Sequence, residues 1–120
     1  MEQNMGVQYI LVNFTKKEAI QFNRLDGTKA RELTGNICSS LITWYMTKNI
    51  GDYISLVPDQ YHEWPFPDFD DQVYLYNDVT EKLIDELIEK EVLKDFGILY
   101  QDSEDKDIYI RDIRNIWNSD

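Results

Sequence analysis

The stretch VQYILVNFTKKEAIQF, residues 7–22, decides how the rest of the chain can fold. Its first half, VQYILVNF (7–14), carries apolar side chains on both faces of an extended backbone, which is typical of a central strand of a sheet. TKKE (15–18) then predicts a turn, and AIQF (19–22) predicts a second strand, antiparallel to the first. We therefore expect the chain to open with a hairpin.

A helix is predicted after this hairpin. NRLDG (23–27) indicates a turn, and TKAREL (28–33) begins a helix that Gly35 interrupts. NICSSLITWYMTKN (36–49) resumes the helix, and its apolar face is so wide that most of the segment is expected to be buried. Gly51 is expected to end it.

The clearest helical pattern is DVTEKLIDELIEKEVLKDFG, residues 78–97, which Gly97 is expected to end. The opposite face of this helix carries Glu81, Asp85 and Glu89 at four-residue spacing, an acidic ridge that costs a few tenths of a kcal/mol per pair. Its apolar stripe consists of Val79, Leu83, Ile84, Leu87, Ile88, Val92, Leu93 and Phe96.

Shorter segments predict further strands. DYISLV (52–57) has the composition of a short strand, and QVYLY (72–76) shows strand-like alternation. GILYQ (97–101) and DIYIR (107–111) predict a second hairpin, whose tip DSEDKD (102–107) carries four acids.

These elements predict a single acidic α+β domain over residues 1–120. We expect a mainly antiparallel sheet, made of the N-terminal hairpin, central strands and the C-terminal hairpin, packed with two principal helices. A chain of 120 residues can bury roughly two-thirds of its unfolded surface, which is enough for one core. The C-terminal segment is expected to dock through Ile113, Ile116 and Trp117.

The net negative charge comes entirely from the second half of the chain. The formal charge is −11; residues 1–60 contain six acids and six bases, whereas residues 61–120 contain 17 acids and six bases. An acidic half of this kind attracts a basic partner and repels nucleic acid and anionic lipid, so neither of these is expected as a partner. Solubility is the alternative explanation of the charge.

Two features indicate a cytoplasmic protein. Cys38 is the single cysteine and lies in the apolar segment ICSSLITWYM (37–46), where a small buried hydrophobic residue is the ordinary interpretation. Residues 1–14 show no basic start, long apolar run or cleavage pattern, so neither a secretory signal nor a membrane span is expected.

Residues 59–71, DQYHEWPFPDFDD, are the strongest candidate for a functional surface. The three prolines of the chain, Pro58, Pro65 and Pro67, fall within ten residues and mark residues 58–71 as a long connection. Large rings and carboxylates alternate along it, and this gives low-entropy anchors next to negative charges. The predicted anchors are Tyr61, Trp64 and Phe66, and the predicted charge partners are Glu63, Asp68, Asp70 and Asp71.

Such a surface imitates single-stranded nucleic acid, whose stacked bases and phosphates a nuclease cleft recognises. A second acidic contact is predicted at the tip of the C-terminal hairpin, with Asp102, Glu104, Asp105 and Asp107. The alternative is that the rings of Trp64 and Phe66 fold inward and cover the core, while the acids are simply solvated. The sequence leaves both interpretations open.

Catalysis and metal binding have weaker support. A nucleophilic pair of Cys38 and His62 would require a thiol on the buried side of a helix to meet an imidazole on a loop. DFDDQ (68–72) begins like a calcium loop, but Val73 replaces its glycine and Val79 its bidentate glutamate. Cysteine and histidine are too few for zinc, and no glycine-rich phosphate loop is present. We expect no catalytic residue, metal or cofactor; a small enzyme using His62 with nearby carboxylates is the weakest option.

A helix followed by a hairpin, LIDELIEKEVLKDFGILYQDSEDKDIYIR (83–111), resembles the second half of a winged helix. The wing of that fold normally contacts phosphate, which four acids at the tip would repel, so the usual DNA docking is excluded unless the hairpin is not the contact. The alternative function is therefore a winged-helix-like regulatory or adaptor domain that acts through protein contacts.

Two pieces, YILVNFTKKE (9–18) and WYMTKNIGDYISLVPDQYHEWPF (44–66), resemble a set of small bacterial proteins that share the WY, GD and WPF landmarks. In size, charge and lack of a catalytic motif, the chain is also similar to the immunity proteins of contact-dependent growth inhibition and related polymorphic toxin systems. This resemblance implies tight inhibition of one cognate toxin, often a basic nuclease. The leading hypothesis is a cytoplasmic immunity-type protein whose acidic second half occupies the cationic cleft of a toxin domain.

Overall fold

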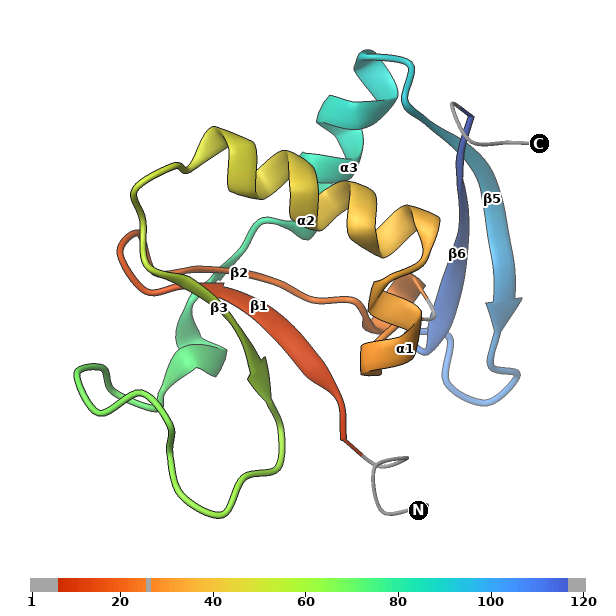
Figure 1. Cartoon of the computed structure of the whole chain (residues 1–120). Helices are drawn as coiled ribbons and strands as arrows, with labels where there is room; N and C mark the ends of the chain where they lie inside the picture. The colour runs from red at the N-terminus through yellow and green to blue at the C-terminus, as the bar shows by residue number, and fades with distance from the viewer. Residues whose placement is uncertain (1–6, 26, 117–120) are drawn as a thin grey trace.

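A four-stranded sheet forms the centre of the computed structural model, which describes residues 7–25 and 27–116 (Figure 1). In order across the sheet, its strands are β3 (Ile54–Pro58), β1 (Tyr9–Asn13), β2 (Glu18–Ile20) and β4 (Asn77–Asp78). β1 pairs antiparallel with both β2 and β3, whereas β4 pairs parallel with β2. The predicted N-terminal hairpin is confirmed, and its first strand is central as expected.

The helices cover one face of this sheet. They are α1 (Ala30–Leu33), α2 (Asn36–Lys48) and α3 (Thr80–Glu89), and Figure 1 shows α2 and α3 on the same side of the strands. The predicted interruption at Gly35 separates α1 from α2. The first core, which we call the helix-side core, lies between the helices, the sheet and the base of the C-terminal hairpin. It contains Leu11, Ile20, Phe22, Leu33, Cys38, Leu41, Tyr45, Val79, Leu83, Ile84, Leu87, Leu93 and Ile113.

A loop without regular structure covers the other face. We call residues 59–72 the proline loop; Figure 1 shows this segment on the side of the sheet opposite α2 and α3. The second core, under the proline loop, is built on Val12, Phe14, Val57 and Val73. Because successive side chains of a strand point to opposite faces, Leu11 packs into the first core and Val12 into the second. The apolar character of β1 on both faces therefore has a physical cause.

The predicted helix over residues 78–96 ends early, at Glu89. The Glu91 N–H donates to the Ile88 carbonyl oxygen (2.9 Å), and the Val92 N–H donates to the Leu87 carbonyl oxygen (2.9 Å). Glu91 has a φ of 63°, so the chain leaves the helix through a residue in the left-handed conformation. Together with the two hydrogen bonds, this is the arrangement of a Schellman motif. The expected end at Gly97 was wrong, because the motif forms at a glutamate that gives no sequence signal.

Replacing Glu91 by glycine is expected to raise the free energy of unfolding by about 1 kcal/mol, because glycine adopts the left-handed conformation without the Cβ penalty. Glu89→Gly, two residues earlier in the last helical turn, is the matched control and is expected to lower it by about 1 kcal/mol. Urea unfolding measures both. A Glu91→Gly variant destabilised as much as Glu89→Gly would contradict the assigned helix end.

The strand predicted over residues 72–76 is also wrong. Val73–Leu75 form the 3-10 helix η3, and only Val73 of these three is buried. The Gln72 N–H donates to the Asp70 side chain (2.7 Å), and the Leu75 N–H donates to the Gln72 carbonyl oxygen (3.0 Å). These local bonds turn the chain, so that it reaches the free side of β2 and pairs there as β4.

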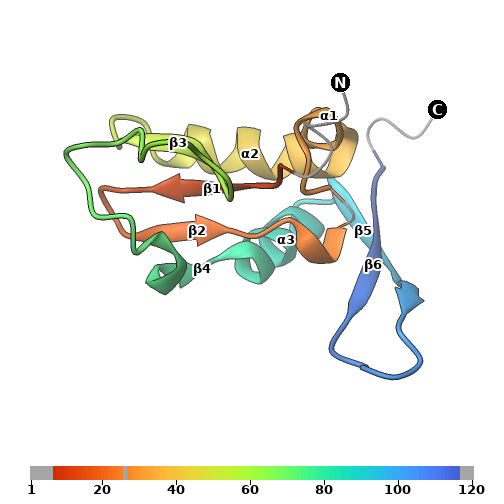
Figure 2. The same ribbon diagram turned by 90° about the horizontal axis from the view of Figure 1, so that it is seen from below.

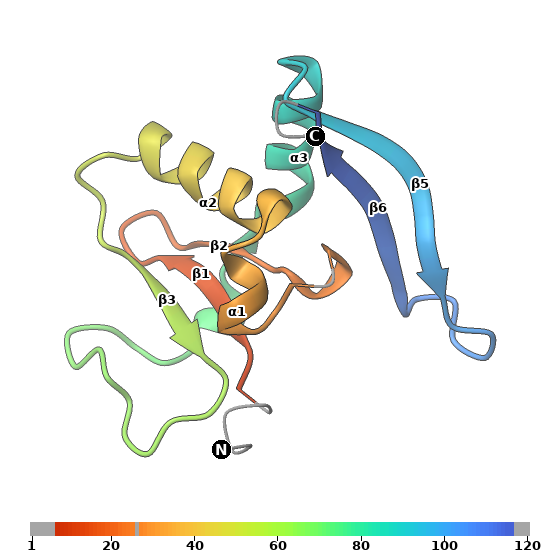
Figure 3. The same cartoon turned by 45° about the vertical axis from the view of Figure 1, so that its right-hand side comes forward.

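The predicted C-terminal hairpin is confirmed as a separate two-stranded sheet, β5 (Leu93–Gln101) and β6 (Tyr109–Asn115). Leu93 and Ile113 reach the helix-side core at its base, whereas Ile116 is 40% exposed and Trp117 lies outside the described residues. Figures 2 and 3 show the tip standing away from the helices and the central sheet. The α+β class with mainly antiparallel pairing is therefore confirmed.

Candidate functional site: the proline loop and its groove

The proline loop is held on the sheet by aromatic packing around Phe14. The Phe14 ring is 3% exposed and stacks on Phe69 at a centroid distance of 4.5 Å. Phe66 lies 5.0 Å from the Phe14 centroid, and Trp64 meets Phe14 edge to face at 6.4 Å. The Trp64 Nε1–H also donates to the Phe69 carbonyl oxygen (2.8 Å), so the indole is held both by ring packing on Phe14 and by a hydrogen bond.

This packing gives the predicted anchors different surroundings. Trp64 and Phe66 are half-buried against the second core, which is the arrangement that the alternative interpretation expected. Tyr61 is 44% exposed and meets the Trp64 ring edge to face at 5.4 Å. Tyr74, at 68% exposed, presents a further ring that the sequence did not single out, because it lies in the segment predicted as a strand.

The predicted charge partners of the proline loop are all exposed. Among the described residues, the acids that form ion pairs belong to other segments: Asp52, Glu81, Glu86, Asp95 and Asp112. Within the described part of the chain, the loop acids therefore form no ion pair with a basic side chain. Burial, and in second place the Asp70 carboxylate, raise the pKa of the Tyr76 hydroxyl.

A groove of about 430 Å³ opens beside the loop, where β1 and β2 diverge; we call it the loop groove. Beyond the last paired residues, Leu11 and Ile20, the Tyr9 N–H donates to the Thr28 carbonyl oxygen (2.7 Å), so it does not extend the β1–β2 pairing. The groove lies between the start of β1, the segment after β2 and the proline loop. Residues that matter for its chemistry are Tyr9, Asp59, Tyr61, Trp64, Asp71 and Tyr74.

The entrance of the proline loop is fixed by hydrogen bonds at Asp59. The Asp59 N–H donates to the Gln8 carbonyl oxygen (2.9 Å), and the Gln8 N–H donates to Asp59 Oδ1 (3.0 Å). Asp71 enters the same groove from the far end of the loop. The fold therefore places two aspartates that are separated by eleven intervening residues of sequence in the lining of one groove.

The second predicted contact, at the hairpin tip, is a locally ordered turn. Asp102 Oδ2 accepts hydrogen bonds from the N–H groups of Asp105 (2.8 Å) and Glu104 (3.0 Å), and these two bonds lower the pKa of the Asp102 carboxyl. Arg24 donates to the Asp107 carbonyl oxygen (3.2 Å), which ties the tip to the segment after β2. Figures 1, 2 and 3 all show the tip well away from the proline loop, so the fold does not join the two predicted contacts into one surface.

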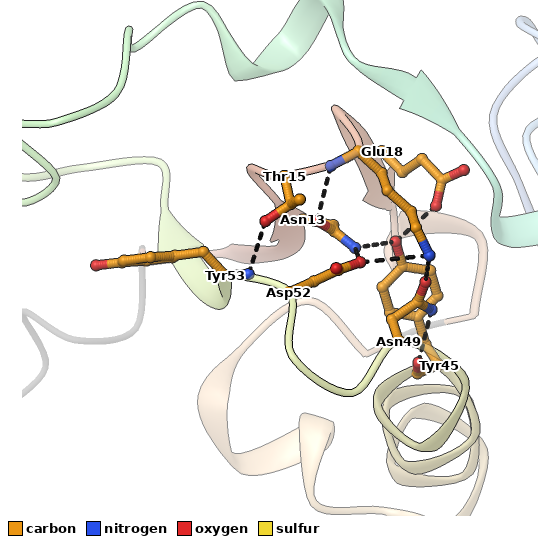
Figure 4. A network of polar contacts seen from close by, with 8 residues as sticks. Asn13, Thr15, Glu18, Tyr45, Asn49, Asp52 and Tyr53 are labelled. Atoms are coloured by element: carbon orange, nitrogen blue, oxygen red, sulfur yellow. Dashed lines mark hydrogen bonds and ion pairs between the residues drawn. The ribbon is translucent and has the colours of Figure 1, made fainter.

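Sequence reasoning missed a buried polar network around Asn13 (Figure 4). Asn13 is 0% exposed, and its Nδ2 donates to the Tyr45 hydroxyl (2.9 Å) and to Asp52 Oδ2 (2.8 Å). Its Oδ1 accepts from the Lys16 N–H (3.0 Å), and Tyr45 in turn donates to Glu18 Oε1 (2.6 Å). The network connects the β1–β2 turn with α2 and with the segment before β3. An asparagine within an apolar strand was the one available signal.

Electrostatics in this network favour a fixed structure over proton transfer. Burial raises the pKa of the Tyr45 hydroxyl well above its ordinary value, and the hydrogen bond to Glu18 acts in the same direction. The hydrogen bond from Asn13 is the largest cause that lowers the pKa of the Asp52 carboxyl, and Lys16 contributes further. Tyr45 is therefore a neutral donor and Asp52 a charged acceptor at neutral pH.

Cys38 and His62 do not meet. Cys38 is 3% exposed in the helix-side core, and its thiol lies 3.6 Å from the Gly27 carbonyl oxygen. His62 is exposed on the proline loop, which covers the opposite face of the sheet. The structure therefore gives no geometry for the nucleophilic pair.

Comparison with known proteins identifies no relative: no family model, no curated protein and no solved structure matches the chain. Within residues 7–25 and 27–116, no three Cys, His, Asp or Glu side chains are grouped so that they could hold a metal ion. Over the same ranges, no helix has both the length and the apolar run that a membrane crossing requires. What the protein does must therefore be inferred from its own residues.

Proposed function

We propose that this protein is an immunity-type inhibitor, which binds a basic protein toxin domain and neutralises it. The proline loop is its principal contact. One observation carries the proposal: the loop presents exposed carboxylates that form no ion pair among the described residues, on a backbone that the Phe14 cluster holds in place. The net charge of −11 adds long-range attraction for a basic partner.

Rigidity and charge together suit an inhibitor. A loop that is already ordered loses less conformational entropy on binding, so more of the contact energy appears as affinity. Close charge pairs across interfaces couple by about 1.5–7 kcal/mol, and complementary fields accelerate association. In this proposal Glu63, Asp68 and Asp70 meet cations of the partner, and Tyr61 contributes an exposed ring. Trp64 and Phe66 hold the loop in position.

Removing two loop charges is expected to weaken binding strongly. Asp68→Asn with Asp70→Asn should lower affinity by about tenfold or more, because each lost pair contributes at least about 1 kcal/mol. The substitution at Asp70 keeps the oxygen that accepts the Gln72 N–H. Binding is measured by calorimetry at low and high salt, against a basic protein captured by the wild-type chain and identified by mass spectrometry.

The control is Asp85→Asn with Glu89→Gln, which makes the same charge change on the exposed face of α3. It should leave affinity within about threefold, because screening weakens charges that are not in contact. Co-expression with the captured protein tests neutralisation, since the wild-type chain should restore growth and the loop variant should not. Equal affinity of the loop variant and the wild type, or binding that ignores salt, would refute the proposed contact.

The winged-helix-like adaptor is the second candidate, and the C-terminal hairpin is the observation that favours it. β5 is buried only at Leu93, and Leu99 is 63% exposed, an arrangement that offers apolar surface to another protein. The exposed apolar residues of the hairpin are Phe96, Ile98, Leu99, Tyr100 and Ile108. If Leu99→Ser abolishes capture of the partner while the loop variant retains it, this second function replaces the first.

A further inference from the structure

We propose that the loop groove is a binding site for an arginine side chain of the partner. This inference rests on the proposed function, because a basic partner supplies the arginine, but it concerns the chemistry of a site that can be tested without that partner. The groove volume of about 430 Å³ falls within the range of about 300–1,000 Å³ that is usual for small-ligand sites.

Aromatic side chains form part of the groove wall. Tyr61 and Tyr74 line the groove and are 44% and 68% exposed, so their rings are accessible from solvent. Trp64 lines it as well, and its bond to the Phe69 carbonyl oxygen fixes the orientation of the indole. A guanidinium stacks on such rings, while its apolar stem contacts the surrounding hydrophobic surface.

Acidic side chains form another part of the groove wall. Asp59 and Asp71 line the groove, and no lysine or arginine stands among the described residues that form it. The bond from the Gln8 N–H uses Asp59 Oδ1 and fixes the direction of that carboxylate. Elsewhere the protein pairs its own arginines with rings: Arg114 lies 4.1 Å from the Phe96 centroid, and Arg24 lies 4.4 Å from that of Tyr109. The described residues of the groove supply rings and carboxylates, and in this proposal the cation comes from another molecule.

Arginine fits this combination better than lysine. Its planar guanidinium can stack on an aromatic face and, at the same time, donate hydrogen bonds in the plane to carboxylates. The lysine ammonium is a compact, strongly hydrated charge that gains less from a flat ring. A neutral side chain of the same shape would keep the stacking but lose the attraction of Asp59 and Asp71.

The test is an NMR titration of the full chain with N-acetyl-arginine methylamide, compared with the lysine and citrulline analogues. Citrulline has nearly the shape of arginine and no charge. We expect saturable shifts of the backbone amides of Asp59, Tyr61 and Asp71 and of the Trp64 indole, with arginine about five- to tenfold tighter than citrulline. Equal affinity for citrulline, or shifts spread over all acidic segments, would overturn the inference.

Variants localise the effect. Asp59→Asn with Asp71→Asn keeps an oxygen for the Gln8 N–H and should abolish the preference for arginine over citrulline. Asp85→Asn with Glu89→Gln makes the same charge change on α3 and should leave that preference intact. Amide spectra of both variants establish that they are folded. An arginine preference that survives in the groove variant would overturn the assigned site.

The two proposals fail in distinguishable ways. If the groove variant binds the captured basic protein as tightly as the wild type, while Asp68→Asn with Asp70→Asn does not, the inhibitor function stands and the arginine site is wrong. If the groove selects arginine over citrulline but no basic protein is captured, the site stands and the inhibitor function is wrong.

Discussion

Replacing Phe14 by alanine is expected to lower the free energy of unfolding by about 3–5 kcal/mol, the usual cost of truncating a buried phenylalanine. Its ring is 3% exposed and stands at the centre of the second core, in contact with five other aromatic rings among the described residues. The variant should also lose order in the proline loop, because the loop has no regular secondary structure and depends on the Phe14 ring for its position.

The expected local consequence separates this variant from general destabilisation. The Phe69 N–H, which donates to the Phe66 carbonyl oxygen (3.0 Å), should lose protection against hydrogen exchange, while amides of α2 stay protected. Denaturant unfolding gives the global value, and near-ultraviolet circular dichroism reports the order of Trp64. Phe96→Ala is the control, since Phe96 is 47% exposed and should cost less than about 1 kcal/mol. Unchanged protection at Phe69 would show that the loop is held by other contacts.

This dependence also bears on function. If the proposed inhibitor function holds, Phe14→Ala should lose affinity for the toxin without any change of charge, because the loop must then be ordered during binding. Phe14→Leu retains most of the buried volume, and its affinity should fall between those of the wild type and Phe14→Ala. The same aromatic cluster thus connects the stability of the second core with the surface that is proposed for recognition.

The central strand could be predicted because its sequence carries apolar residues on both faces. Leu11 and Val12 are apolar and adjacent, so a strand that contains them must be covered on both faces. The identity of the second cover could not be predicted. The proline loop follows neither helical nor strand periodicity, and its rings alternate with charges, so the pattern does not show which side chains turn inward.

The end of α3 could not be predicted from the sequence for a different reason. Val92 and Leu93 continue the apolar stripe of the helix, although Leu93 is already the first residue of β5. An apolar residue satisfies either element, and the change of direction depends on Glu91 in a left-handed conformation that glutamate adopts only when tertiary contacts require it. The sequence pattern was consistent with both outcomes, and packing against the helix-side core decided between them.

The candidate site was predictable in its chemistry and not in its geometry. The charges and rings of residues 59–71 are evident from the sequence, whereas the approach of Asp59 and Asp71 to one groove requires the loop to close over β1. Tyr74 was missed because its segment alternates like a strand. The Gln72 N–H donates to the Asp70 side chain and the Leu75 N–H to the Gln72 carbonyl oxygen, and these local bonds turn the segment into η3. Such closure depends on contacts between residues far apart in the chain, which periodicity does not encode.

Replacing Asn13 by alanine is expected to lower the free energy of unfolding by about 3 kcal/mol, which for a chain of this size corresponds to roughly 10 °C in Tm. The side chain is 0% exposed and makes three hydrogen bonds, one of them to the carboxylate of Asp52. Alanine would leave the Lys16 N–H and Asp52 without these partners inside the fold. Thermal and urea unfolding measure the loss, with Asn77→Ala, an exposed asparagine in β4, as the control.

The pH dependence gives this variant a second, independent signature. The hydrogen bond from Asn13 holds the pKa of the Asp52 carboxyl below its ordinary value of 3.8. Because the folded pKa is depressed, the stabilisation from Asp52 is present above about pH 4 and is lost as the pH falls through the folded value. Asn13→Ala moves that pKa back toward its ordinary value, so stability should fall less between pH 5 and pH 2 in the variant than in the wild type. Two results would mean that the network does not hold the β1–β2 turn to α2. One is a loss of unfolding free energy no larger than that of Asn77→Ala, and the other is the same fall in stability between pH 5 and pH 2 as in the wild type.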